Sequence, residues 1–256
     1  MNVLVCVKRV PFTGGKINLT ADGQEIETKH LGFTISPHEE CAVEEAVRLS
    51  ETQGVSTAVL TLGPAPAEEQ LRDALAMGIE RAILLETDGR EWDPAATANA
   101  IVEAIRSEQA DGITYDALFF GNEAGDTGDY QVGIRVAHTL DLPCVTGIKA
   151  LEIKDGKAIA RREASGGQEV YEVSLPAVFT MKEGINLPRY PPLMGRLKAK
   201  KKEIKRLQPQ WQDGGLAKTL LRLPKGHEKQ VEILGKGLEA ASKVVEVLQK
   251  LGIVQP

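Results

Sequence analysis

The sequence predicts an α/β protein built on a doubly wound parallel sheet, a Rossmann-like arrangement. Short apolar runs of strand length alternate four times with longer segments whose apolar residues recur at helical spacing. Right-handed crossovers turn such an alternation into a parallel sheet covered by helices on both faces. Hydrophobic residues make up 42% of the 256 residues and charged residues 26%, which is typical of a folded domain and excludes a disordered chain.

The first half of the chain supplies these units in order, with an irregular or hairpin segment at residues 17–33. Ser36 is the expected N-cap of the first helix, Pro37 stands at the first helical position, and Glu39 closes a capping box. Gly54 is expected to end that helix. Strands are expected at 2–8, 56–62, 81–86, 117–120 and 142–145, and the later helices at 67–77, from Asp93-Pro94 onward, and at 132–140.

From residue 147 the pattern changes to short alternating runs, which predict antiparallel hairpins at 151–153, 157–161 and 169–173. The turn at Ser165-Gly166-Gly167 is similar to the phosphate loop of ATP pyrophosphatases. That loop follows the first strand of such domains, so here we interpret the segment as a hairpin turn. A buried strand is expected at 175–180, with Pro176 as its first residue or at a sheet edge.

The loop between the fourth strand and its helix is the candidate ligand site. Residues 121–128 are rich in residues that accept positive φ or offer oxygen atoms and backbone N–H groups. A loop that leaves a parallel strand and opens a helix favours phosphate, because the free helix-start amides and the helix dipole attract anions. No GxGxxG or P-loop pattern is present, so an ordinary connection is the alternative.

Composition excludes several classes of function. A net charge of −5 and an aromatic content of 4% argue against a nucleic-acid platform. The three cysteines, Cys6, Cys41 and Cys144, lack CxxC spacing, so neither a zinc site nor a disulfide framework is expected. Cys6 and Cys144 lie in apolar strands, which predicts buried inert thiols. The lack of a signal peptide and of a run of about 18 apolar residues predicts a cytoplasmic protein.

The C-terminal part is irregular before it becomes helical. A proline-stiffened exposed loop is expected at 188–195, followed by seven positive charges within residues 196–206. An amphipathic helix is expected at 237–252, with an apolar face that the polar segment before it cannot bury. We therefore expect an α/β domain over residues 1–206, including the hairpins and a partner loop at 186–200, and a C-terminal arm and helix over residues 207–256.

Three stretches resemble the β subunit of electron-transfer flavoproteins, and two shorter ones agree with them, so that the likeness extends over residues 1–206. They lie at 71–82, 161–180 and 186–204, and at 7–10 and 42–49. The resemblance implies a heterodimer whose α subunit holds a redox-active FAD while the β subunit binds a structural AMP. Because the apolar face of the C-terminal helix has no home in this chain, we expect it to pack on that α subunit. It also implies an electron carrier without substrate turnover, working in fatty acid β-oxidation between acyl-CoA and related dehydrogenases and a membrane quinone oxidoreductase.

The resemblance further implies which residues meet the bound groups. Thr13 and His38 fall where the β subunit approaches the isoalloxazine, although relatives often carry aromatic residues there, and Glu163 matches an acidic residue near the flavin. The positions that correspond to AMP contacts are Cys6, Ser36, Pro37, His38, Glu39, Leu62, Gly63, Gly121, Asn122, Glu123, Ala124, Gly125, Asp126, Thr127, Gly128, Asp129, Tyr130, Gln131 and Val132.

The partner loop carries a further implied residue. Leu193 matches the leucine that anchors redox partners in the family, with Tyr190 and Met194 beside it. It directly follows Pro191-Pro192, which restricts the backbone and lowers the entropy lost on docking.

Two alternatives stay open. In electron-bifurcating relatives a second FAD replaces AMP, and their loop resembles Gly125-Asp126-Thr127 and Gln131-Val132-Gly133 of this sequence, although Asp129 and Tyr130 intervene. A free-standing adenine-nucleotide sensor related to universal stress proteins would use the same fold. Such a sensor would need neither the hairpins nor the proline-rich basic loop.

Overall fold

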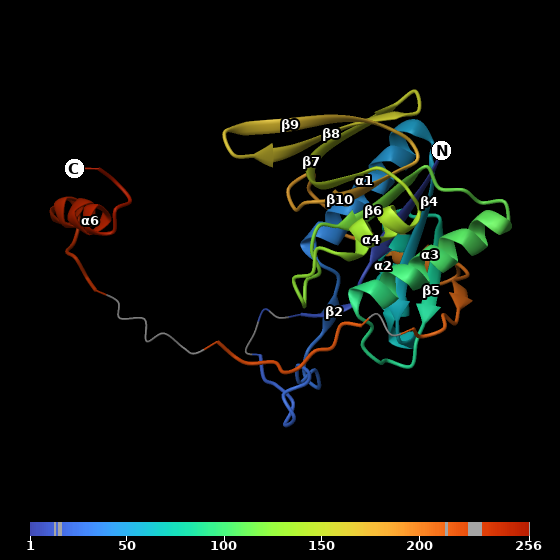
Figure 1. Ribbon diagram of the computed structural model, residues 1–256, viewed down its shortest axis with the longest axis horizontal. Helices are drawn as coiled ribbons and strands as arrows, with labels where there is room; N and C mark the ends of the chain where they lie inside the picture. Colours follow the sequence, from blue (N-terminus) through green and yellow to red (C-terminus); the bar gives the residue numbers. More distant parts are fainter. Residues whose placement is uncertain (13, 15–16, 213–214, 225–231, 256) are drawn as a thin grey trace. The chain divides into compact units, whose positions relative to one another are not determined.

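The computed structural model describes residues 1–12, 14, 17–212, 215–224 and 232–255. The chain divides into two compact units, Met1–Leu220 and Leu221–Pro256, which are described separately. In the first unit, a single sheet provides the framework (Figure 1). Its order is β11 (Lys205–Leu207), β5 (Arg81–Glu86), β4 (Ser56–Gly63), β1 (Asn2–Val7), β6 (Ala117–Gly121), β10 (Ala177–Met181), β7 (Cys144–Lys154), β8 (Lys157–Ala164) and β9 (Gly167–Ser174).

Neighbouring strands from β11 to β7 pair in parallel, and only β8 and β9 are antiparallel. Helices α1 (Pro37–Gln53) and α2 (Glu68–Met77), the latter preceded by the 3-10 turn η1 (Ala65–Ala67), share one core with the sheet. Helices α3 (Pro94–Ala110) and α4 (Val132–Thr139) share the other. Val3 and Val5 point into the first core and Leu4 and Cys6 into the second, so β1 is buried on both faces. The predicted doubly wound fold is confirmed.

The helix ends follow from local sequence. The Ser36 hydroxyl accepts the N–H of Glu39 while the Glu39 carboxylate accepts the N–H of Ser36, which is the predicted capping box. Gly54 ends α1 with φ of 66°, a left-handed conformation that suits glycine. Asp93 caps α3 by accepting the N–H groups of Ala95 and Ala96.

The hairpins are present, but two predictions about strands were wrong. The expected strands at 142–145 and 151–153 are one strand, β7, whose register against β8 shifts between Ile148 and Ala150. This bulge lets one strand pair with the parallel sheet at its start and with the hairpin at its end. Pro176 does not mark a sheet edge, because β10 begins after it and lies between β6 and β7.

The basic segment is more regular than the sequence predicts. Residues Leu193–Ala199 form helix α5, so Leu193 begins a short helix where a loop was expected to continue through Gly195. Residues 205–207 then extend the sheet as β11 beside β5. The two positive charges of β11 form ion pairs: Lys205 contacts Glu108 and Asp111, and Arg206 contacts Glu68 and Glu86.

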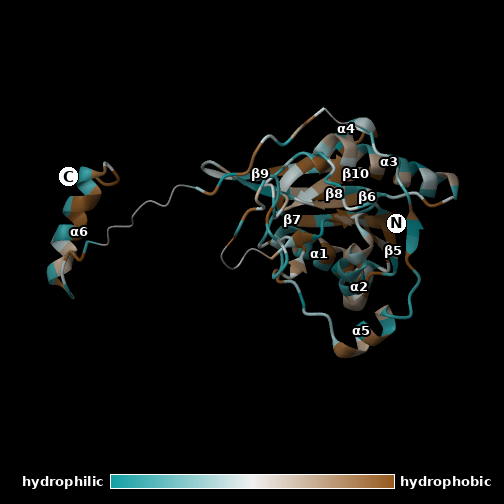
Figure 2. Cartoon of the chain, turned by 90° about the horizontal axis from the view of Figure 1, so that it is seen from below, coloured by the Kyte–Doolittle hydropathy of each residue, from teal (hydrophilic) through white to brown (hydrophobic). Residues whose placement is uncertain are grey.

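Two smaller features complete the description. β2 (Val10–Pro11) and β3 (Phe33–Thr34) form a two-stranded antiparallel sheet, and Leu19 pairs with Ile26 in the segment where a short hairpin was one of the two expectations. In the second unit, α6 (Glu239–Lys250) is amphipathic and has no buried residue (Figure 2). Among the described residues, no helix has the length and apolarity needed to cross a membrane.

Candidate nucleotide and cofactor site

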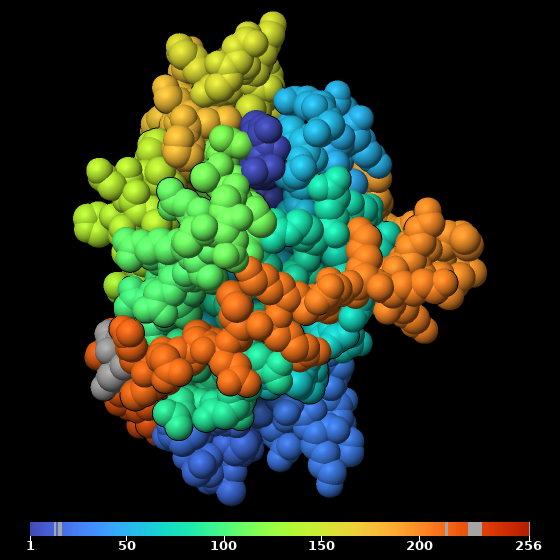
Figure 3. All heavy atoms as spheres, turned by 90° about the vertical axis from the view of Figure 1, so that its right-hand side faces the viewer, coloured from blue at the N-terminus to red at the C-terminus, as the bar shows by residue number. Residues whose placement is uncertain are grey.

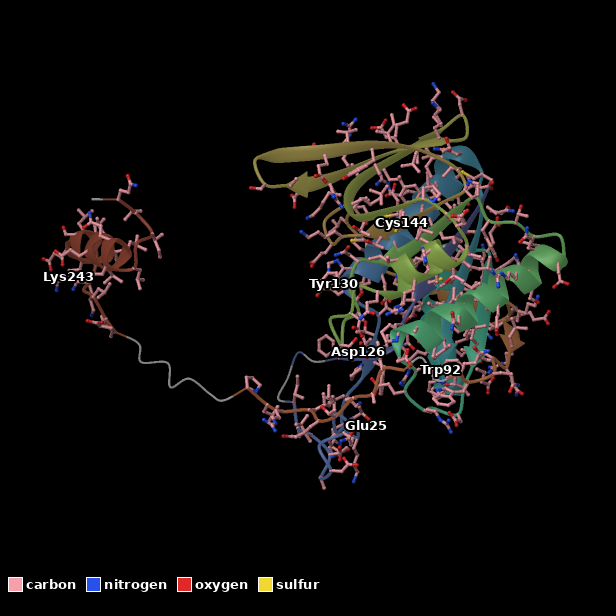
Figure 4. All side chains as sticks on the ribbon, in the orientation of Figure 1. Glu25, Trp92, Asp126, Tyr130, Cys144 and Lys243 are labelled. Carbon is pink, nitrogen blue, oxygen red and sulfur yellow. The ribbon has the colours of Figure 1, made fainter. Side chains whose placement is uncertain are left out.

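The candidate site lies at the carboxyl ends of β1, β4 and β6. The loop at 121–132 leaves β6 and leads into α4, and Figure 4 shows Asp126 and Tyr130 on this loop at that edge of the sheet. Cys6 pairs with Phe120 of β6 and with Leu60 of β4, so the end of β1 lies between the other two strand ends. Leu62 and Gly63 end β4 on the same edge. The structure thus brings together residues that the sequence separates by more than a hundred positions.

The Glu39 carboxylate joins the end of β1 to the start of α1. It accepts the N–H of Lys8 on Oε1 and the N–H of Ser36 on Oε2, each at 2.8 Å, and its residue is buried. Burial raises the pKa of Glu39 to about 7, against the opposing effect of the N–H groups of Ser36 and Lys8. Satisfying two backbone donors with one buried side chain fixes the geometry of both segments.

The loop at 121–132 packs against Glu39 and the two segments that Glu39 connects. A Cβ at Gly121 would lie 2.7 Å from Cγ of Glu39, so only glycine allows this approach. Lys8 Nζ donates to Asp126 Oδ1 at 2.8 Å, which ties the loop to β1. At Gly125 a Cβ would lie 3.2 Å from Cβ of Ser36, which is also tight.

Part of the loop is held by its own hydrogen bonds. Ala124 N–H donates to the Asp129 carbonyl at 3.0 Å, and Gly128, with φ of 67°, donates back to the Ala124 carbonyl at 2.9 Å. No hydrogen bond to a described residue uses the backbone N–H of Gly125 or Asp126. These two amides, next to the N-terminus of α1, are available to an anion.

A second group of predicted residues lines a cleft of about 560 Å³ beside the loop. Glu163, on the hairpin strand β8, lies in this cleft with Asn122, Glu123 and Tyr130 of the loop. Lys182 approaches Glu163 at 3.8 Å, and the Tyr130 hydroxyl donates to Glu123. The cleft is therefore lined both by the loop and by Glu163, which only the family resemblance had linked to this site.

His38 stands at the border of this cleft. Its Nδ1 accepts the N–H of Glu183 at 2.8 Å, so the neutral ring carries its proton on Nε2. Nε2 lies 3.8 Å from Glu123 Oε2, close to the loop. Thr13, the other residue expected to approach an isoalloxazine, lies outside the described residues.

The thiols are shielded. Cys6 is buried, and burial raises its pKa far above the ordinary value. Cys144 is half-buried, and burial raises its pKa to about 11. Both thiols stay protonated near neutral pH, which makes them poor nucleophiles, and both fit the predicted role of inert side chains.

Away from the cleft, one segment exposes several large apolar side chains. Tyr190 is 94% exposed and Leu193 74%, and Met194 is also exposed. The sequence reasoning had missed Leu187, which is 91% exposed and precedes the proline-rich stretch. In Figure 3 this segment, in light orange, projects from the side of the first unit.

Comparisons with known proteins point to one family. A family model described as the electron transfer flavoprotein domain matches residues 25–210. The electron transfer flavoprotein subunit beta of Syntrophomonas wolfei is 42% identical over 206 residues, covering 80% of this chain and 78% of that protein. The subunit beta of Bacillus subtilis is 37% identical over 210 residues, covering 81% and 79%. That of Dictyostelium discoideum is 29% identical over 255 residues, covering 99% of both chains.

The buried carboxyl group of Glu39 predicts a specific pH dependence of the folding stability. Because the folded pKa of about 7 lies above the ordinary value of 4.5, the stability associated with Glu39 is fully present below pH 4.5 and is lost as the pH rises through 7. The wild type should therefore lose on the order of 3 kcal/mol relative to Glu39→Gln across that range. Urea unfolding of both proteins at a series of pH values measures this difference.

Glu39→Gln also replaces one carboxylate oxygen with an NH2 group, which cannot accept a hydrogen bond. The variant should therefore also lose some folding stability at every pH. Glu103→Gln, on the exposed side of α3, is the control and should follow the wild-type profile. Parallel profiles for the wild type and Glu39→Gln would contradict the titration assigned to Glu39.

Proposed function

This chain belongs to the electron transfer flavoprotein family, as a β subunit, and from that membership we propose that it assembles with an α subunit into an electron carrier without substrate turnover. Electrons would come from acyl-CoA and related dehydrogenases and pass to a membrane quinone oxidoreductase. A cytoplasmic location stays a prediction. Family membership, together with the hairpins and helix α5, favours this carrier over a stand-alone nucleotide sensor.

In this proposal, the loop at 121–132 binds AMP as a structural group. The observation that carries it is the preformed cradle at the carboxyl edge, where Glu39 fixes β1 and α1 and the loop packs on both. The free amides of Gly125 and Asp126 suit a phosphate, and Ser36, Pro37, Leu62 and Gly63 surround the same edge. A second FAD in place of AMP is the competing candidate.

The FAD of the α subunit would approach the cleft beside the loop. Glu163, Lys182 and Tyr130 line that cleft, and His38 borders it through Glu123. Their role would be to orient and charge-balance a flavin that the partner holds.

Nucleotide content tests the proposal. Coexpression with an α subunit should give a yellow heterodimer, and acid extraction followed by chromatography should release one FAD and one AMP per heterodimer. Two FAD molecules would place the chain with the electron-bifurcating relatives. A colourless homodimer that binds ATP would contradict the carrier function itself.

We also propose that α6 packs on the α subunit, because none of its residues is buried and its apolar Val244 and Val245 are exposed, as is Leu251 directly after it. A chain that ends at Leu220 removes this helix and keeps the segment after β11, where Lys218 pairs with Glu91 and Thr219 accepts a hydrogen bond from Gln24. The truncated chain should form a weaker heterodimer in size-exclusion chromatography at low concentration. Its thermal unfolding should stay cooperative. A loss of cooperativity would assign α6 to the core of its own subunit.

Leu193 is the proposed anchor for redox partners. It is 74% exposed at the start of α5, directly after two prolines, with Tyr190 and Met194 exposed beside it. A single apolar side chain on a stiff segment can supply a hot spot without restricting the choice of partner.

Truncation of Leu193 to alanine should therefore weaken docking by about 1–3 kcal/mol, which corresponds to roughly 5- to 150-fold in the apparent KM of a dehydrogenase for the heterodimer. Flavin content and Tm should stay near wild type. Leu216→Ala, which truncates another exposed leucine of the first unit, is the matched control. A Leu193→Ala protein that melts several degrees lower but transfers electrons normally would show that the residue belongs to the core.

A further inference from the structure

The segment from Leu187 to Leu197 is unusual because it is both apolar and exposed. Leu187, Tyr190, Leu193 and Met194 are all more than 60% exposed, at 91%, 94%, 74% and 63%. A short chain with this composition gains by collapsing onto the nearest apolar surface, and Pro191 and Pro192 stiffen the backbone locally without fixing the direction in which the segment leaves the core. Other contacts must hold the segment away from the core.

Arg189 provides the first of these contacts. Its Nε and Nη2 donate to the two oxygens of Glu44, at 2.9 Å each, and its Nη1 and Nη2 donate to the two oxygens of Glu51, at 2.6 and 2.8 Å. Its backbone N–H also donates to Glu44, at 3.1 Å. Glu44 and Glu51 lie seven residues apart on α1, two helical turns, so both face the same guanidinium. We call this arrangement the Arg189 clamp.

The clamp leaves Arg189 little capacity for other partners. Four of the five guanidinium N–H donors are used. The hydrogen bonds that Arg189 donates to Glu51 and Glu44 raise the pKa of Arg189, and the hydrogen bond from Arg189 lowers the pKa of Glu51. Glu44 is buried, so the loss of Arg189 would leave a buried carboxylate without its cation.

A second attachment holds the other end of the segment on a different helix. A Cβ at Gly195 would lie 2.1 Å from the carbonyl oxygen of Ala76, so α5 approaches α2 at a distance that only glycine permits. Arg72 of α2 donates to the carbonyl oxygens of Ala199 and Lys202 at the end of α5. Leu193 therefore lies on a short span between α1 and α2, fixed at both ends.

We propose that Arg189 is a positioning residue for partner docking: by bridging Glu44 and Glu51 it fixes the approach to α5, so that Leu193 is presented before a partner arrives. This inference rests on the proposed docking role of Leu193. Rigid presentation matters because the entropy of ordering a mobile segment is otherwise lost at each encounter, which weakens binding without removing any contact.

The test uses the complete heterodimer loaded with FAD and measures kcat and KM with a dehydrogenase. Arg189→Ala should raise KM about three- to tenfold and leave kcat at saturation unchanged. The double variant Arg189→Ala/Leu193→Ala should be no worse than Leu193→Ala alone, because the clamp acts through that side chain. Additive losses would show that Arg189 acts by itself and would overturn the inference.

Variants of the carboxylates separate positioning from a direct charge contact. Glu51→Gln weakens the clamp on its exposed side without leaving a buried charge unpaired, so it remains informative if Arg189→Ala fails to fold. The clamp predicts a raised KM for Glu51→Gln, together with faster amide hydrogen exchange over 187–197. If Arg189 instead contacted a carboxylate of the partner directly, Glu51→Gln would free it for that contact, and KM would be unchanged or lower. That result would overturn the inference. Arg189→Lys should behave like Arg189→Ala, because an ammonium cannot bridge two carboxylates in bidentate fashion.

Lys157→Ala, on the hairpin, is the control. Lys157 of β8 pairs with Glu172 of β9, away from the 187–197 segment and from the two helices that hold it, and KM should stay at the wild-type value. If Leu193→Ala leaves KM unchanged, the docking role of Leu193 and the positioning role of Arg189 are both contradicted. If Leu193→Ala raises KM and neither Arg189→Ala nor Glu51→Gln does, only the clamp is wrong.

Discussion

The buried carboxylate of Glu39 is the contact on which the arrangement of this subunit depends. It binds the last part of β1 to the start of α1, and the loop after β6 can pass only because Gly121 presents no side chain to it. α1 then continues for 17 residues, roughly 25 Å, and carries Glu44 and Glu51 to the segment that presents Leu193. One helix, oriented by one carboxylate, therefore sets the geometry of both the candidate nucleotide site and the proposed docking segment.

Charged side chains hold the outer elements of the fold in place. Glu108 is buried and accepts hydrogen bonds from Arg81, Tyr115 and Lys205, so it ties β5 and α3 to the edge strand β11. Arg206 adds contacts to Glu68 and Glu86. Part of the positive run at 196–206 is thus neutralised by acidic partners of the same unit. Part of the basic stretch therefore serves ion pairs within the unit.

Sequence reasoning succeeded where the determinants are local. The alternation of apolar runs, the capping box at Ser36 and the glycine after α1 each depend on residues within one element. It failed for β11 and α5, because a three-residue strand has no periodicity and prolines conceal a helix start. The same holds for the functional regions. The position of the loop after β6 could be predicted from local sequence. The Arg189 clamp could not, because Arg189 lies 145 positions from Glu44 and 138 from Glu51, and such contacts leave no sequence pattern.

The aromatic residues of this subunit are few, and their placement determines what optical spectroscopy can report. The chain has two tryptophans. Trp92 packs beside the core under α3 and is seen in Figure 4 at that end of the unit. Trp211 lies 5.1 Å from the guanidinium of Arg90, two residues before Trp92. Intrinsic tryptophan fluorescence therefore reports on the junction between the start of α3 and the segment that follows β11. Tyr130 is the aromatic residue that lines the cleft, so tryptophan emission does not report on the cleft, and a flavin bound there as proposed would be followed by its own emission.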